Sequence, residues 1–557
     1  MNGDYTEIAL ADCALPDGWR RQSTAFNELG ELPVLTASHP AETLLLHAPC
    51  HGRWQMSLGL YRAPGTLGEV EVRIAGGRWQ TLRPVYFIDD RAGGLQDVRL
   101  DARVFRRGDG IRVRPVARQA SQCGLAWLRF LPSGPDEQRH KQRVGAVCDP
   151  HGMFARGNFE GIDDIHGLLQ PFVDSDFDRV CFGMGAGSFR MLYFSDVLPW
   201  FGKDCDRMHN EANARVAQTL AVFRKQQVDP IRAAIAWCHE HSMQFWAGDR
   251  ICHCFAPGAY GNDFAAPFYL DHPELRTMHE DGCRGHTVSP AHREYQDLKL
   301  ALYREWLEMG VDGIYIDLQR KPGIVGVDAP AVAAFKREVG RAPTAADLRT
   351  VRWMRIRAGV ITEFIRRVRA LLDGFDKSRR IPLAIQGFMG VRSLADGQVD
   401  ENLIQGYAID QWVAENLIDV FAPSTSRHYA PQALGPYRRW TDGTACELWG
   451  CLGQFHNSLF AADYRHAVYF GDDPGKFITP IGDLDVRRVM QSAADCYAQG
   501  ADGVFLWEAG ETPQCPERWR HLRRLGDRER LLRQYAAAIG PLDGRHRVRQ
   551  WPLAQFV

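Results

Sequence analysis

The chain has 557 residues, of which 45% are hydrophobic and 24% are charged, and its formal net charge is -1. This composition is typical of a globular protein with room for two or three domains. The balanced charge argues against a nucleic-acid partner or an anionic membrane, and no apolar run approaches the roughly 18 residues that span a bilayer.

The N-terminus and the cysteines bear on the cellular compartment. Residues 1–19 contain no basic segment and no apolar run, so no signal peptide is visible, although a secreted protein trimmed of its leader would look the same. Four of the 14 cysteines lie in strand-like apolar runs, namely Cys148, Cys181, Cys446 and Cys451. Buried free thiols at these positions favour a cytoplasmic protein. Cys252-His253-Cys254 lacks the spacing of a structural zinc site, and we expect neither a metal nor a cofactor.

The first 135 residues show the alternation of β-strands. From about residue 25 to 130, apolar and polar residues alternate in short runs such as Glu69–Ile74 and Ile111–Arg114. Glycine-rich turns such as Gly76-Gly77 separate these runs. Period-two patterning with frequent turns predicts an antiparallel β-sandwich over residues 1–135.

From about residue 140 the pattern changes to short apolar runs that alternate with amphipathic helices. The eight predicted strands are Val144–Cys148, Arg179–Gly183, Gln244–Gly248, Gly313–Leu318, Leu383–Phe388, Asp419–Ala422, Cys446–Gly450 and Val504–Trp507. Eight such repeats predict a closed parallel sheet, the (β/α)8 or TIM barrel, over residues 140–515. Residues 516–557 are expected to form a C-terminal helix and tail that pack on the barrel or the sandwich.

Two segments of the predicted barrel echo one another. Met309–Asp317 resembles Gln499–Trp507, and each follows an amphipathic helix. In both, a glycine ends the helix and an Asp-Gly pair leads into a buried strand, which is the chemistry of an αβ loop. Asp312 and Asp502 are therefore expected at the amino-terminal ends of the strands, with a structural role.

Reactive groups of such barrels lie at the carboxyl ends of the strands. Three carboxylates there are the catalytic candidates: Asp317 ends the fourth strand, Glu447 lies in the seventh, and Glu508 follows the eighth. Candidates for substrate binding at or after strand ends are Asp149, His151, Asp249, Arg250, Arg320 and Gln386, with Trp449 and Trp507 as stacking platforms.

Hydrolysis of a glycosidic bond needs two carboxyl groups, one as acid and one as nucleophile or base. The fourth and seventh strands occupy facing parts of the ring, so Asp317 and Glu447 can converge, with either one as the acid. A buried Glu–Arg ion pair is the structural alternative for Glu447, because an unpaired buried charge is costly. Alternation places Trp507 inside the funnel and Glu508 at first outside it.

Other motifs give weaker signals. Gly183–Gly187 follows a strand but lacks the complete dinucleotide fingerprint, so nucleotide binding is not expected. The arginines of Arg518–Arg533 alternate with leucines and indicate a solvated helix face. The motifs of serine hydrolases and zinc proteases are absent.

Three segments together resemble a known group of proteins. They are Phe268–Arg276, Gly310–Asp317 and Asp410–Val420. With the N-terminal sandwich, they resemble the bacterial glycosyl-hydrolase-like (family 10-like) TIM-barrel proteins over residues 30 to 510. The resemblance implies a barrel that binds or cleaves a saccharide, with Asp317 in the active site and His272-Pro273-Glu274 on a nearby loop. At Ile385-Gln386-Gly387 the group has a basic residue, so the resemblance leaves the charge of the substrate open.

The sequence thus predicts a glycosidase that cleaves an O-glycosidic bond of a carbohydrate substrate. A non-catalytic saccharide-binding barrel remains an alternative. A lyase or isomerase acting on a sugar acid is another, although no lysine at a strand end supports it. The sandwich is either a carbohydrate-binding module or a domain that packs on the barrel, and homo-oligomerisation stays open.

Overall fold

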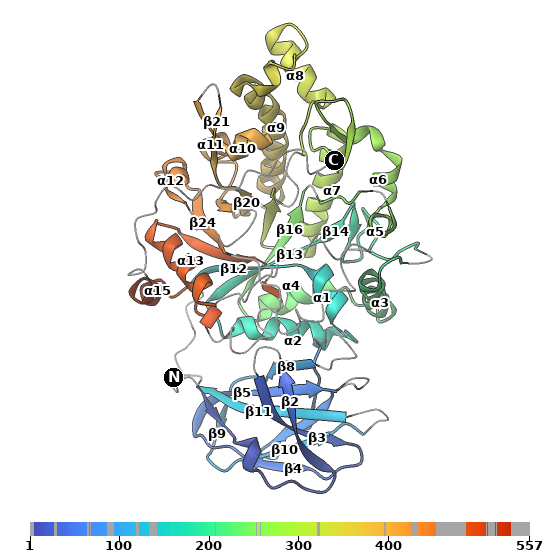
Figure 1. The fold of residues 1–557 in the computed structure, drawn as a ribbon, viewed down its shortest axis with the longest axis vertical. Coiled ribbons are helices and arrows are strands. Elements are labelled where there is room, and N and C mark those ends of the chain that lie inside the picture. Colours follow the sequence, from blue (N-terminus) through green and yellow to red (C-terminus); the bar gives the residue numbers. More distant parts are fainter. Residues whose placement is uncertain are drawn as a thin grey trace.

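Antiparallel sheets at the N-terminus stand beside a closed parallel barrel (Figure 1). The computed structural model describes residues 5–535 apart from 27–29, 64–65, 67, 86–93, 118–121, 133–141, 158, 206–207, 252, 257, 320–323, 395–396, 425–432, 453–485, 508, 511–518 and 520. Among the helices of these residues, none is long and apolar enough to cross a membrane.

Two antiparallel sheets form the N-terminal sandwich. The larger contains β1 (Thr6–Glu7), β2 (Trp19–Phe26), β3 (Gly30–Ser38), β5 (Gly52–Arg62), β8 (Gly94–Arg99), β9 (Arg103–Phe105) and β11 (Gln122–Pro132). The smaller contains β4 (Leu44–His47), β6 (Val70–Ile74), β7 (Gln80–Leu82) and β10 (Gly110–Pro115). Every second residue of β6 and β10 is buried, and these residues pack with those of β3, β5 and β11 in one apolar core. The alternation in the sequence therefore reflects one buried and one exposed face.

The barrel contains eight parallel strands in chain order. They are β12 (Gln142–Cys148), β13 (Phe177–Gly183), β16 (Gln244–Arg250), β19 (Gly313–Asp317), β20 (Leu383–Phe388), β23 (Val420–Ser424), β24 (Glu447–Leu452) and β25 (Gly503–Trp507). The pairing of β25 with β12 closes the ring. The predicted fold class is confirmed, and each of the eight predicted strands corresponds to one observed strand.

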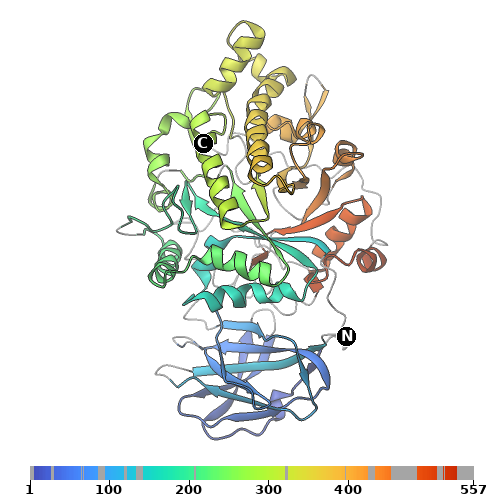
Figure 2. The ribbon, with the colours of Figure 1, turned by 180° about the vertical axis from the view of Figure 1, so that it is seen from behind.

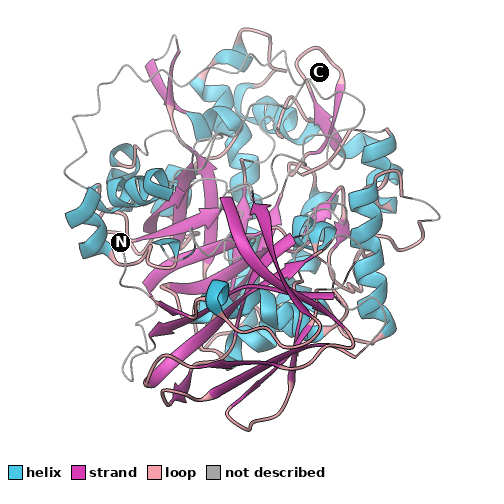
Figure 3. Ribbon diagram, turned by 60° about the horizontal axis from the view of Figure 1, so that its bottom comes forward, coloured by secondary structure: helices cyan, strands magenta, loops and turns pink. Residues whose placement is uncertain are grey.

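Helices surround the barrel strands, as Figure 3 shows in cyan. They are α1 (Pro150–Arg156), α2 (Ile162–Val173), α3 (Glu211–Lys225), α4 (Pro230–Glu240), α5 (Ala259–Asn262), α6 (Pro267–Asp271), α7 (Arg293–Met309), α8 (Ala329–Val339), α9 (Val351–Phe375), α10 (Glu401–Gln405), α11 (Ile409–Ala414), α12 (Gly435–Thr441), α13 (Val486–Ala498) and α15 (Arg528–Tyr535). Three hairpins project from the loops, namely β14 (Gly185–Gly187) with β15 (Arg190–Met191), β17 (Arg276–Met278) with β18 (Arg284–Val288), and β21 (Val391–Leu394) with β22 (Gly397–Asp400).

The barrel interior is a packed aromatic core and not a pore. Trp246, Trp449 and Phe505 are fully buried there, with 0% exposure. Each ring lies against a glycine of a neighbouring strand: a Cβ on Gly313 would stand 2.7 Å from the Trp246 ring, and one on Gly503 would stand 2.7 Å from the Trp449 ring. Large rings opposite glycines pack closely in the interior.

The sandwich attaches to the outer helices of the barrel, next to α2 (Figures 1 and 2). Arg83 donates to Asp164 of α2, with an Nε–Oδ1 distance of 2.9 Å, and forms an ion pair of 2.7 Å with Glu160. Gln55 of β5 also donates to Asp174, the residue that ends α2. At the other end of the chain, Trp519 is buried between the barrel and its helices, 5.3 Å from the ring of Phe172.

Candidate active site at the barrel mouth

We call the carboxyl ends of the eight strands the barrel mouth and their amino ends the barrel floor. At the mouth, five strands contribute side chains on the inward-facing register. They are Asp149 after β12, Arg250 of β16, Asp317 of β19, Gln386 of β20 and Trp507 of β25. All five were predicted as site residues, and they converge because the strands of a parallel barrel end at the same side.

Asp317 is the last residue of β19 and has only 2% of its surface exposed. Its Oδ1 accepts a hydrogen bond of 2.8 Å from the backbone N–H of Gln319. Arg250 is its register partner on the neighbouring strand β16. A fixed N–H donor stabilises negative charge on a carboxyl group, whereas burial opposes it.

A chain of hydrogen bonds runs beside Asp317 and orients the side-chain amides of Gln386 and Gln319. The hydroxyl of Tyr315 donates to Oε1 of Gln386, whose Nε2 donates over 3.1 Å to Oε1 of Gln319. Nε2 of Gln319 in turn donates to the backbone carbonyl of Ser424 at the end of β23. Burial, with the nearby Cys451 and Asp317, raises the pKa of Tyr315, which therefore stays a neutral donor. The orientation of Gln386 at the mouth is thus determined by its neighbours.

Asp149 and Arg250 form the second polar feature of the mouth. Arg250 NH1 lies 2.8 Å from Oδ2 of Asp149, and the two side chains are 11% and 20% exposed. Asp149 also caps α1, since its Oδ1 accepts from the N–H of His151. The Arg250 guanidinium lies 5.2 Å from the ring centroid of Trp507, so the ion pair and the indole together border one side of the mouth.

His151 lies behind this ion pair in a buried polar chain. Its Nε2 is 3.1 Å from Oδ1 of Asn213, whose Nδ2 donates over 2.8 Å to Asp263. Asp263 also accepts from the backbone and the ring of His209. Because the amide of Asn213 donates to Asp263, its oxygen faces His151, and Nε2 of His151 carries the proton. His151 therefore links α1 to α3, and its expected role in substrate binding stays a prediction.

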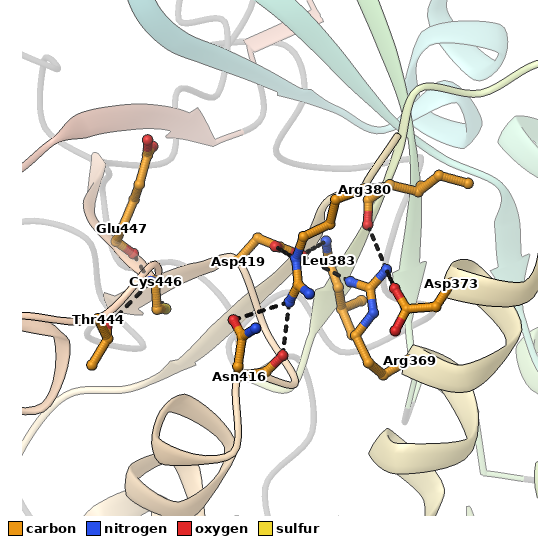
Figure 4. A network of polar contacts seen from close by, with 10 residues as sticks. Arg369, Asp373, Arg380, Leu383, Asn416, Asp419, Thr444, Cys446 and Glu447 are labelled. Atoms are coloured by element: carbon orange, nitrogen blue, oxygen red, sulfur yellow. Dashed lines mark hydrogen bonds and ion pairs between the residues drawn. The ribbon is translucent and has the colours of Figure 1, made fainter. Parts of the chain in front are cut away.

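Glu447 lies at the barrel floor, so the expectation that it meets Asp317 across the funnel is wrong. It is the first residue of β24, whereas Asp317 is the last residue of β19. Its backbone N–H donates over 2.8 Å to the carbonyl of Asp419, beside the floor network of Asp419, Arg369 and Arg380 (Figure 4). Its carboxylate forms an ion pair of 3.0 Å with Arg143. The Glu–Arg pair considered as the alternative is what the structure contains.

Replacing Glu447 with Gln is expected to leave any turnover within about twofold of the wild type, because the side chain is at the end opposite the mouth. The loss of an ion pair whose partners are 57% and 31% exposed is expected to lower stability only slightly, by about 0–1 kcal/mol. Gln can still accept the 2.8 Å hydrogen bond from Trp449 Nε1. Activity assays and urea unfolding check both parts, and a large loss of turnover would restore Glu447 as a catalytic residue.

Trp449 and Asp249 were also predicted as site residues, but neither side chain faces the barrel mouth. Trp449 is completely buried in the interior below the mouth, with its ring centroid 4.5 Å from that of Phe505, so it cannot stack on a substrate. Asp249 points outward from β16, because side chains alternate along a strand and Arg250 faces inward. Its two oxygens bind Lys299 Nζ at 2.8 Å and the hydroxyl of Tyr303 at 2.6 Å.

Arg320 and Glu508 lie outside the described residues, so their predicted roles stay predictions. The loop residues His272 and Glu274 pair with each other at 2.9 Å and are 41% and 56% exposed. Their expected place beside the site also stays a prediction.

The structural roles of Asp312 and Asp502 are confirmed. Oδ2 of Asp312 accepts from the N–H of Phe245, and Oδ2 of Asp502 accepts from that of Leu448, at 2.8 Å and 2.9 Å. Asp419 does the same for Leu383 at 2.7 Å. Three αβ loops thus use one device, an Asp carboxylate that holds the start of the preceding strand at the barrel floor.

The sequence did not single out Asp400, whose pKa is raised to about 6, mainly by burial and also by the nearby Asp410. Asp400 is the N-cap residue of α10, and its Oδ1 accepts over 2.9 Å from the N–H of Asn402. A capping Asp is common at such a position. The signal in the sequence was therefore that of a helix start, and only the surrounding structure raises the pKa.

Replacing Asp400 with Asn is expected to stabilise the protein at pH 7 to 8 by about 1–2 kcal/mol and to have little effect near pH 4. The folded-state pKa lies above the ordinary value of 3.8, so the contribution of Asp400 to stability is lost as the pH rises through about 6. Asn accepts the same capping bond but carries no charge to bury. Melting temperatures between pH 4 and 8 test this, with the exposed Asp12→Asn as a control for net charge; a constant difference across that range would contradict it.

Comparisons with known proteins find distant likenesses among solved structures. No protein-family model and no curated protein matches the chain. Similar solved structures include α-L-fucosidase isoenzyme 2 from Paenibacillus thiaminolyticus, at 11% identity and a TM-score of 0.41, over 71% of this chain and 50% of the fucosidase. The α-galactosidase TtGalA from Thermus thermophilus matches at 12% identity and a TM-score of 0.35, over 92% of this chain and 95% of its own.

A third similar structure is the cyclic α-maltosyl-(1→6)-maltose hydrolase of Arthrobacter globiformis. It is 11% identical, with a TM-score of 0.34, over 66% of this chain and 73% of its own. The chain spans only half the length of the fucosidase. Such distant likenesses carry no information about the reaction, and the resemblance to the family 10-like glycosyl hydrolases stays a prediction.

Proposed function

We propose that the barrel hydrolyses a glycosidic bond and that Asp317 is one of its two reacting carboxyl groups. The observation that carries the proposal is the position of Asp317: it ends the fourth strand, is 2% exposed, and is oriented by the N–H of Gln319. A carboxylate held in this way at a barrel mouth can attack an anomeric carbon or accept a proton from water.

The environment of Asp317 favours the nucleophile or base over the acid. The N–H of Gln319 stabilises the ionised form, and Arg250, the register partner of Asp317, carries a positive charge on the adjacent strand. The acid must then come from another strand end. Asp149 and Glu508 are the candidates, the first at the mouth and the second after β25 and outside the described residues.

Trp507 supports the assignment of a saccharide as the substrate. It is the last residue of β25, and its indole lies beside Arg250 at the mouth, with 3% of the residue exposed among the described residues. A flat apolar ring next to an ion pair matches a sugar, which has C–H faces and a rim of hydroxyls.

The test is a panel of aryl glycosides and oligosaccharides assayed with the wild type and with Asp149→Asn, Glu508→Gln and Asp317→Asn. Loss of the acid is expected to slow glycosides with poor leaving groups and to spare those with good ones, whereas loss of the nucleophile slows both. Hydrolysis of no member of the panel by the wild type would reject the proposal.

A saccharide-binding barrel without catalysis is the second candidate. One observation favours it: Asp149, the other described carboxylate at the mouth, is already engaged by Arg250 and by the N–H of His151. Calorimetric binding of saccharides in the absence of any turnover would establish this alternative.

A further inference from the structure

A small cavity opens beside the barrel mouth, between the β14–β15 hairpin, the end of β16 and α7. Figure 1 shows these elements grouped on one side of the barrel. The cavity has a volume of about 30 Å³, and its charged lining residues are Arg190, Asp249, Arg250 and Lys299. This volume holds roughly two water molecules and therefore a small polar group, not a nucleotide.

The lining carries more positive than negative charge. Arg190 and Lys299 are 6% and 7% exposed, so both cations are buried. Asp249 compensates Lys299 at 2.8 Å, and Asp149 compensates Arg250 at 2.8 Å. Among the described residues no carboxylate lies within ion-pair distance of Arg190, which leaves its charge in excess.

Arg190 is also incompletely hydrogen-bonded. Its NH1 donates over 2.8 Å to the backbone carbonyl of Lys203, while its Nε is buried without an acceptor among the described residues. A buried guanidinium with an open donor and no counter-ion is costly unless an anion completes it. Lys299 beside it has further N–H donors once Asp249 has accepted one.

The glycines that the sequence analysis singled out border this cavity. Gly185 and Gly187 belong to its lining. At Gly187 the backbone has a φ of 123°, and a Cβ would stand 2.8 Å from the ring of Phe255. The motif therefore serves a tight hairpin whose backbone approaches the cavity, which accounts for these glycines without a nucleotide.

Arg250 connects the cavity to the candidate active site. It lines the cavity, forms an ion pair with Asp149, and lies 5.2 Å from the Trp507 ring centroid. Because Arg250 borders both places, one molecule could put an anionic group in the cavity and also reach the mouth. A carboxylate fits the volume and pairs with arginine in two-point geometry.

We propose that this cavity binds the carboxylate of an acidic saccharide, such as a uronic acid residue, while the sugar ring occupies the mouth. The proposal rests on the proposed function and names its substrate class. It assigns Arg190 as the residue that distinguishes an acidic from a neutral sugar, with Lys299 beside it.

Calorimetry with matched pairs of sugars tests the proposal. The probes are D-glucuronate and D-galacturonate and their oligosaccharides, each compared with the neutral sugar of the same stereochemistry. The wild type is expected to bind the acidic member about tenfold or more tightly. Arg190→Gln is expected to remove this preference and to leave the affinity for the neutral member unchanged.

Two variants control the experiment. Arg293→Gln makes the same change on the surface of α7, where the side chain is 68% exposed, and is expected to keep the full preference. Arg190→Lys keeps the charge but not the two-point geometry and is expected to keep part of it. Melting temperatures establish that both Arg190 variants are folded.

Each outcome decides the proposal without any need for turnover. Equal binding of acidic and neutral sugars by the wild type overturns it, as does a preference that survives in Arg190→Gln. Binding of inorganic sulfate or phosphate alone, with no gain for uronates, would make the cavity a site for a free oxyanion and would also overturn it. Failure of the proposed hydrolysis appears separately, as a wild-type protein that cleaves no glycoside of the panel.

Discussion

Replacing Asp317 with Asn is expected to lower kcat for glycoside hydrolysis by about a thousandfold or more, with no comparable change in KM. The amide is almost isosteric and its oxygen can still accept from the N–H of Gln319, but it can neither attack an anomeric carbon nor take a proton. The melting temperature is therefore expected to stay close to that of the wild type.

The matched control for this prediction is Glu447→Gln, which makes the same carboxyl-to-amide change at the barrel floor. The two variants together separate a role at the mouth from a general effect of losing a carboxylate of the barrel. Full turnover in Asp317→Asn would show that the reacting groups lie elsewhere. Equal losses in both variants would indicate a structural and not a chemical cause.

Replacing Asp249 with Ala is expected to destabilise the barrel by about 3–5 kcal/mol. The change leaves the ammonium of Lys299, which is 7% exposed, without its carboxylate at 2.8 Å. It also removes the acceptor of the fully buried Tyr303 hydroxyl. Urea unfolding monitored by tryptophan fluorescence measures the loss, because many of the indoles lie in or around the barrel.

A double variant tests whether the uncompensated charge of Lys299 causes the loss of stability. Asp249→Leu with Lys299→Met removes both charges and fills the space with apolar atoms, so most of the lost stability is expected to return. An unfolding midpoint of Asp249→Ala equal to that of the wild type would contradict the claim that the ion pair stabilises the barrel. A double variant as unstable as the single one would attribute the effect to packing.

Local patterns in the sequence identified the fold. Each barrel strand is a short apolar run between a helix and a turn, so all eight could be recognised from neighbouring residues alone. The αβ loops could also be recognised from neighbouring residues. Gly310 and Gly500 end their helices with φ angles of 99° and 86°, and Asp312 and Asp502 follow them. Left-handed caps need glycine, which makes such loops visible in a sequence.

The role expected of Glu447 did not agree with its position along the predicted strand. β24 runs from Glu447 to Leu452, beyond the predicted end at Gly450. An apolar run shows that a strand exists, but its boundaries are uncertain by a few residues. Glu447 is already the second residue of the predicted strand Cys446–Gly450, near its amino end, so the expectation that it faces Asp317 at the mouth did not follow from these bounds.

The sequence by itself determined the barrel, the sandwich and the place of Asp317 at a strand end, because periodicity and turn chemistry are properties of neighbouring residues. Only the tertiary structure decided which charges meet. Arg190 and Lys299 are far apart in the chain and line one cavity because a hairpin after β13 packs beside α7. Contacts between residues that are distant in the chain depend on how strands tilt and helices pack, and no pattern among neighbouring residues encodes these contacts.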